Sequence, residues 1–137
     1  MVHALQQTHR ILHRNGVLIN VFDLPTPHVI EVHSTDSVEK VGWLLDKDDF
    51  DSERSALNAL AQVVADRYFI LENEQDFIFN IYADDLNELQ EWLAIWWESA
   101  ILKDRILQRL EVLIRDVGQS ARIVLVLRAR MIKLRAA

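Results

Sequence analysis

Residues 9–23 read HRILHRNGVLINVFD, and this stretch sets the fold that the rest of the chain has to complete. The spacing of apolar residues predicts a helix over 2–13, which Asn15-Gly16 ends because glycine readily takes the left-handed conformation of a helix cap. The residues VLINVF at 17–22 then form a predicted strand with apolar side chains on both faces. Such a strand is typical of a buried position in a parallel sheet.

The remaining sequence predicts further strands and helices in alternation. The strands are a β-hairpin over 28–45 that turns at Ser34–Ser37, two short strands over 68–85 that turn at Asn73-Glu74-Gln75, and a long last strand over 122–134. Three further helices are predicted. The first runs over 51–67 with Asp51 or Ser52 as its cap, and the second runs from the capping box of Asp85 and Glu88 to about residue 102. The third runs over 104–116, with Gly118 just past its end. This order predicts an α/β or α+β fold, a mixed sheet with helices packed on it, in one domain over 1–137.

Composition narrows the function classes. The chain has 137 residues, no cysteine and a net charge of −6. The acidic balance disfavours nonspecific nucleic-acid binding, and no apolar run approaches the roughly 20 residues of a membrane span. We therefore predict a cytoplasmic protein that binds neither nucleic acid nor membrane.

The opening stretch resembles class I S-adenosylmethionine-dependent methyltransferases. In that family a helix that ends in an R-x-L-x-x-x-G-like pattern leads into the fifth strand of the sheet, and Arg10, Leu12 and Gly16 stand in this pattern. The segment YFILENEQDFIFNIYADDLNELQEWL resembles the family's later strand and acidic-capped helix, and RIVLVLRARMIKL resembles its last strand. The resemblance implies that the last strand is antiparallel and lies between strands five and six.

The resemblance covers only the second half of the family's domain. The cofactor of the family is held by a G-x-G-x-G loop and an acidic residue in the first half, whereas the three glycines here, Gly16, Gly42 and Gly118, are far apart. No catalytic or cofactor-binding residue is carried over, and no cofactor is expected. The chain is then expected to be a non-catalytic homodimeric module that binds a partner or a small ligand. The alternatives are the substrate-side half of a split methyltransferase completed by a separate chain, and an independent α+β fold.

The strand at 17–22 is the predicted dimer edge. In the complete family fold this strand has a fourth strand beside it, and that strand is absent here. An apolar strand with open N–H and C=O groups associates with a further strand unless something covers it. We therefore expect two copies to pair through Val17, Leu18, Ile19, Val21 and Phe22.

Other residue patterns suggest ligand sites, each with a simpler alternative. Trp43, Trp96 and Trp97 are candidates for an aromatic pocket, although residues 89, 93, 96 and 100 also have the spacing of a helical core stripe. His9 and His13 have the i, i+4 spacing of zinc ligands and need a third ligand from His28, His33 or Asp23, but without an H-E-x-x-H motif a polar helix face is the preferred interpretation.

Two charged clusters are interpreted as solvated surface. The basic end of the chain, Arg128, Arg130, Lys133 and Arg135, is expected to form the solvent face of an edge strand and not a nucleic-acid site. The acidic residues between 46 and 51 lack the glycine and glutamate of a calcium loop, so we expect them to cap a helix.

Overall fold

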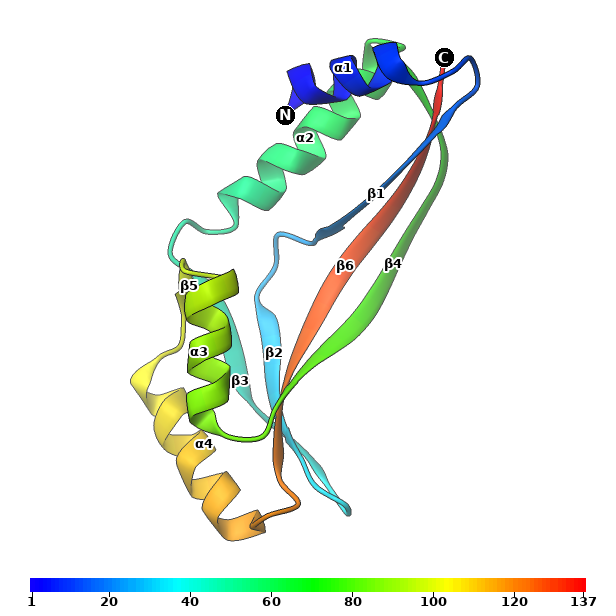
Figure 1. Cartoon of the computed structure of the whole chain (residues 1–137). Coiled ribbons are helices and arrows are strands. Elements are labelled where there is room, and N and C mark those ends of the chain that lie inside the picture. The colour runs from blue at the N-terminus through cyan, green and yellow to red at the C-terminus, as the bar shows by residue number, and fades with distance from the viewer. The chain divides into compact units, whose positions relative to one another are not determined.

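The computed structural model describes residues 1–137, with four helices and six strands. The chain divides into two compact units (Figure 1): unit 1 comprises Met1–Pro25, Phe50–Phe77 and Arg128–Ala137, and unit 2 comprises Thr26–Asp49 and Ile78–Leu127. The α/β fold class is confirmed, and the registered strand pairs are all antiparallel. That residues 1–137 form one domain stays a prediction.

Unit 1 is a small sheet covered by two helices. It contains α1 (Val2–Ile11), β1 (Val17–Asp23), α2 (Asp51–Ala65), the first part of β4 (Phe69–Ala83) and the second part of β6 (Arg122–Ala136). β1 pairs antiparallel with β6, from Val17 opposite Arg135 to Asp23 opposite Ala129. β4 pairs with β6 as well, and its carboxylates contact β6 in reverse order, Glu72 at Arg135 and Asp76 at Arg130. β6 therefore lies between β1 and β4 and runs antiparallel to both.

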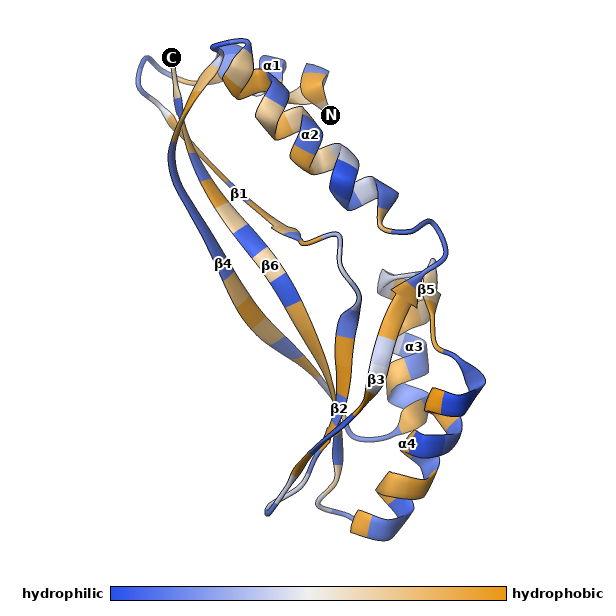
Figure 2. Ribbon diagram, turned by 180° about the vertical axis from the view of Figure 1, so that it is seen from behind, coloured by the Kyte–Doolittle hydropathy of each residue, from blue (hydrophilic) through white to orange (hydrophobic).

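The helices of unit 1 pack on one face of these strands. Leu5 of α1 and Leu60 and Val63 of α2 form a core with Ile132 and Leu134 of β6. Arginines and lysine interrupt the apolar residues in this part of β6, and Figure 2 shows the resulting alternation of hydrophilic and hydrophobic bands. From Ile132 to Ala136 the alternation fits a strand with one face on a core and the other turned outward: Ile132, Leu134 and Ala136 are buried, whereas Lys133 and Arg135 between them are not.

Unit 2 is built on the hairpin of β2 (His28–His33) and β3 (Val38–Asp46). The predicted turn is confirmed, because the Ser34 N–H donates to the Ser37 carbonyl at 2.9 Å. β2 pairs with the first part of β6, and β3 pairs with the short β5 (Ala100–Ile101). α3 (Leu86–Trp96) and α4 (Asp104–Val117) share a core with this sheet, formed around Ile30, Leu44, Leu89, Leu110, Ile123 and Leu125.

Gly42 of β3 allows a close approach of α4. A Cβ atom at this position would lie 2.3 Å from Cδ1 of Ile106. Carbon atoms in contact are normally about 3.5–4.0 Å apart, so any larger residue here displaces the Ile106 side chain.

Three predicted helix ends are corrected. Asn15, with φ 65°, takes the left-handed conformation that was expected of Gly16. Neither Asp51 nor Ser52 caps α2: the helix starts directly after Phe50, which takes the left-handed conformation and has a buried side chain. The predicted helix to about 102 ends at Trp96, because Trp97 leaves the helical conformation and residues 100–101 pair with β3. The capping contact at Asp85 is confirmed: its Oδ1 accepts from the Glu88 N–H at 2.8 Å.

The two short strands expected over 68–85 are one continuous strand, β4. The predicted turn at Asn73-Glu74-Gln75 stays extended, because β4 pairs with β6 along this stretch; the flanking carboxylates also contact cations on β6. Glu72 pairs with Arg135 at 2.7 Å, and Asp76 pairs with Arg130 at 2.6 Å. Pairing with a strand that is distant in the sequence therefore replaces the local turn.

Candidate functional site

The β1 strand has one strand neighbour, β6, and its backbone groups alternate between that neighbour and the open side. The Ala136 N–H donates to the Gly16 carbonyl at 2.8 Å, and the Leu24 N–H donates to the Arg128 carbonyl at 2.9 Å. In an antiparallel ladder every second residue makes such bonds, so the even-numbered residues of β1 direct their N–H and C=O groups to β6. The odd-numbered residues, Val17 to Asp23, direct theirs to the open edge.

The side chains of β1 divide in the same way. Leu18 and Phe22 pack against the core of unit 1, whereas Val17, Ile19 and Val21 are 42%, 59% and 55% exposed. The expectation of a buried strand is therefore wrong for one face of β1. The five predicted dimer-edge residues therefore form two groups. Leu18 and Phe22 pack inside unit 1, whereas Val17, Ile19 and Val21 are exposed and have their backbone groups on the open edge.

The outer face is the sheet surface formed by Val17, Ile19 and Val21 of β1 and, opposite them on β6, by Arg135, Lys133 and Met131. Its cations are already paired: Glu72 contacts Nζ of Lys133 at 3.0 Å and Nε of Arg135 at 2.7 Å. Hydrogen bonds from these two cations, Lys133 first, hold the pKa of Glu72 below its ordinary value. The outer face therefore presents an apolar row beside charges that balance one another. The expectation that these cations lie on an edge strand is wrong, because β6 lies inside the sheet.

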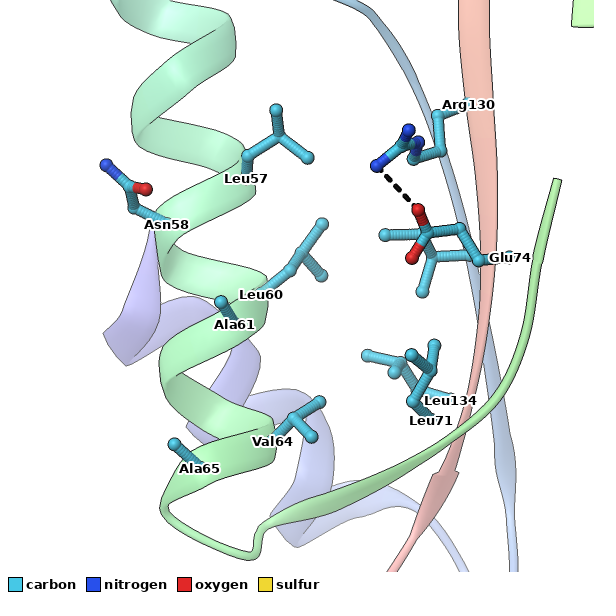
Figure 3. A pocket seen from close by; sticks show the side chains of 11 residues that line it. Leu57, Asn58, Leu60, Ala61, Val64, Ala65, Leu71, Glu74, Arg130 and Leu134 are labelled. Atoms are coloured by element: carbon cyan, nitrogen blue, oxygen red, sulfur yellow. Dashed lines mark ion pairs between the residues drawn. The ribbon is translucent and has the colours of Figure 1, made fainter. Parts of the chain in front are cut away.

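Unit 1 also contains a groove that the sequence did not reveal. It has a volume of about 520 Å³ and lies between α2 and the strands β4 and β6 (Figure 3). The lining is mostly apolar, and the polar residues in it are Asn58, Glu74 and Arg130; the others are Leu57, Leu60, Ala61, Val64, Ala65, Leu71, Ile132 and Leu134. The size and lining are typical of a small-molecule site. The sequence signal for this groove is the pair Ala61 and Ala65, four residues apart on an otherwise leucine-rich helix face. This pattern is too common in helices to identify a groove.

Charged side chains close one part of this groove. Nη1 of Arg130 contacts Glu74 at 2.5 Å, and its Nε and Nη2 contact the two carboxylate oxygens of Asp76 at 2.6 and 3.0 Å. The hydrogen bond to Asp76 raises the pKa of Arg130, and the same bond lowers the pKa of Asp76. The guanidinium is thus already committed to two carboxylates.

The three predicted pocket tryptophans do not form one group. Trp43 lies opposite Val29 on the hairpin with the Nζ of Lys40 3.8 Å from its ring centroid, and its neighbour Leu44 is buried in the core. Trp97 packs on that core side, with its ring 5.1 Å from His28. Trp96 is 73% exposed, so the interpretation of residue 96 as part of the core stripe is wrong as well.

Asp46 is the polar centre of unit 2, and sequence analysis assigned it only a general capping role. Its Oδ2 accepts from the Trp97 indole N–H at 2.7 Å and from the Ser99 hydroxyl at 2.5 Å, while its Oδ1 accepts from the Asp48 backbone N–H at 2.8 Å. These bonds tie the segment after α3 to the end of β3. The arrangement anchors the chain and explains why α3 ends where it does.

The histidines considered as zinc ligands, His9 and His13, have no third ligand placed beside them. No group of three or more metal-ligating side chains is placed to hold a metal ion. His9 instead lies edge-on to Tyr68 and Phe69, at 5.5 and 5.4 Å between ring centroids. His28 is buried in unit 2.

None of the helices combines the length and the apolar character that a membrane span requires. No family model, no curated protein and no solved structure matches the chain.

Proposed function

We propose that this chain is a non-catalytic interaction module that acts as a homodimer, in which the β1 strands of two copies pair antiparallel. One observation carries the proposal: Val17, Ile19 and Val21 of β1 have both exposed apolar side chains and backbone groups that face the open edge. An edge of this kind templates the addition of another strand. A second copy supplies a strand of matching length and composition.

The register of the dimer follows from the alternation of the backbone groups. Odd-numbered residues have to face odd-numbered residues, because only they direct hydrogen-bonding groups outward. One two-fold arrangement sets Ile19 opposite itself and Val17 opposite Val21, so each outward pair is apolar. The neighbouring arrangement sets Val17 opposite Asp23, a carboxyl whose pKa is already raised by burial. Apolar cross-strand pairs contribute about 0.2–1 kcal/mol each, so the register with Ile19 on the axis is favoured.

The strand arrangement supports a relation to the second half of the methyltransferase domain. β6 lies between β1 and β4 and antiparallel to both, as the last strand of that family lies between strands five and six. In that family a fourth strand lies beside strand five, at the position that corresponds to the open edge of β1. The proposed dimer covers that side with a second β1.

Native mass measurement on three proteins tests the proposal: the unchanged chain, Ile19→Lys and the control Ile78→Lys. Ile78 lies on β4 and is 63% exposed, against 59% for Ile19, so both lysines are placed at exposed apolar strand positions. We expect the unchanged chain and Ile78→Lys to have twice the chain mass at micromolar concentration and Ile19→Lys to be monomeric. A monomeric unchanged chain, or a dimer lost only in Ile78→Lys, contradicts pairing through β1.

The same open edge also fits a second function, the substrate-side half of a methyltransferase completed by a separate chain. This chain alone is then expected to leave S-adenosylmethionine unbound, as in the homodimer proposal. A thermal-shift titration checks this, since a ligand at 100 times its Kd stabilises by about 2.7 kcal/mol. A positive shift with the isolated chain contradicts both proposals, and a monomeric chain that captures a strand-bearing partner through β1 favours the split enzyme.

A further inference from the structure

The groove between α2 and β4 keeps apolar walls in contact with solvent. Leu71 of β4 is 45% exposed, although it lies across from Leu60 and Val64 of α2 (Figure 3). Ala61 has only a methyl group on the α2 side, so the helix does not fill the space of about 520 Å³. Water in such a hollow is easily displaced by an apolar molecule, because burial of each apolar surface is favourable.

The charged part of the groove has no unbalanced charge to offer a ligand. Arg130 is bound by Glu74 and Asp76, and of these three residues Arg130 and Glu74 line the groove. The lining of the groove therefore holds one guanidinium and one carboxylate, and these two groups are paired with each other. An anionic ligand would have to displace a carboxylate from Arg130, and a cationic ligand would have to compete with the arginine for its carboxylates. Burial of an unpaired charge beside the apolar walls is costly.

We propose that this groove binds an uncharged, largely hydrocarbon molecule whose single polar group, a hydroxyl or carbonyl, lies toward Arg130 and Glu74. The polar end follows from the N–H and carboxylate groups there, and the apolar body follows from the leucine, valine and isoleucine walls. Binding in the groove is independent of the β1 edge, because its lining comes from α2, β4 and the helix side of β6, and none of it from β1.

The experiment uses the neutral dye Nile red with the full-length chain and three competitors of equal chain length, namely decan-1-ol, decanoate and decylammonium at neutral pH. We expect dye fluorescence to rise on binding and decan-1-ol to displace the dye at a concentration at least about tenfold below either charged competitor, a factor worth about 1.4 kcal/mol. Displacement by decanoate at an equal or lower concentration would overturn the assignment, because it would mean that Arg130 is available to an anion.

Two variants locate the binding. Ala61→Trp fills the mouth of the groove, and Leu71→Lys places a charge on its wall; both positions are exposed, so the fold is expected to tolerate the changes. The matched control is Ala94→Trp, which adds the same side chain to an exposed position of α3 in the other unit. We expect both groove variants to weaken dye binding at least about tenfold and the control to leave it unchanged. Unchanged binding in the two groove variants would overturn the proposal, whatever the native mass of the chain.

Discussion

Ile19 of β1 lies opposite Lys133 of β6 on the outer face of unit 1, with 59% of its surface exposed. The residue before it, Leu18, lies opposite Leu134 and packs into the core of the same unit. Adjacent residues of one strand therefore have opposite roles: Leu18 holds the unit together, and Ile19 is available for association.

Alanine at each position should separate these roles. We expect Leu18→Ala to lower the free energy of unfolding by about 2 kcal/mol or more, since it removes packed methyl groups from a core. Ile19→Ala should change the stability of the monomer by less than about 0.5 kcal/mol, as exposed substitutions do, while weakening the proposed dimer. Urea unfolding at two protein concentrations distinguishes the two effects. Equal loss of stability for both variants at low concentration would contradict the division.

The Asp46 carboxylate is expected to be the main polar support of unit 2. Its replacement by alanine leaves the Trp97 N–H and the Ser99 hydroxyl without this acceptor. Hydrogen bonds to a charged group contribute about 1.5–3 kcal/mol each, so we expect Asp46→Ala to cost about 3 kcal/mol. Denaturation followed by tryptophan fluorescence measures this. Asp48→Ala, which keeps the backbone N–H that bonds to Asp46, is the control and should cost little.

The ion pairs between β4 and β6 predict a loss of stability in acid. Hydrogen bonds from Lys133 and Arg130 lower the pKa values of Glu72 and Asp76, respectively. The unfolded chain then binds more protons, so this stabilisation is present above the ordinary carboxyl range near pH 4 and is lost as the pH falls through the lowered values. The double variant Glu72→Gln/Asp76→Asn should show a flatter decline of unfolding free energy between pH 5 and pH 2. A decline as steep as that of the unchanged chain would contradict the assignment.

Asp23 predicts the opposite dependence. Burial raises its pKa, so the folded chain binds more protons than the unfolded chain in the range just above the ordinary aspartate value. Its contribution to stability therefore falls as the pH rises through that range. We expect Asp23→Asn to be more stable than the unchanged chain at pH 7 and to lose this advantage near pH 3. A variant that is less stable at pH 7 would show that the charged carboxylate has a stabilising partner.

Local patterns in the sequence predicted the elements whose causes are local. The Ser34–Ser37 turn, the Asp85 capping contact and the glycine past the end of α4 each depend on residues within a few positions of one another. The last strand was also predicted. The resemblance implied a place for it between two other strands, whereas its charge pattern had been interpreted as that of an edge strand. The fold class followed from the alternation of these elements.

Features with distant causes were missed. β4 is continuous along β6, where Asp76 contacts Arg130, 54 positions along the chain. α3 ends early where Trp97 contacts Asp46, 51 positions before it. The groove requires side chains from α2, β4 and β6 at once. Neither periodicity nor capping patterns contain such pairings. For the proposed dimer edge, the sequence suggested the strand but not which of its side chains face outward.

The most direct test of pairing through β1 is disulfide formation at position 19, because the chain contains no cysteine of its own. In the proposed register Ile19 faces its own copy, and Cα atoms of a hydrogen-bonded antiparallel pair lie about 5.5 Å apart, within the range that a disulfide spans. Under mild oxidation we expect Ile19→Cys to form a covalent dimer, a mixture of Val17→Cys and Val21→Cys to form a mixed dimer, and the control Ile78→Cys to stay uncrosslinked. A native dimer in which position 78 crosslinks and position 19 does not would contradict pairing through β1.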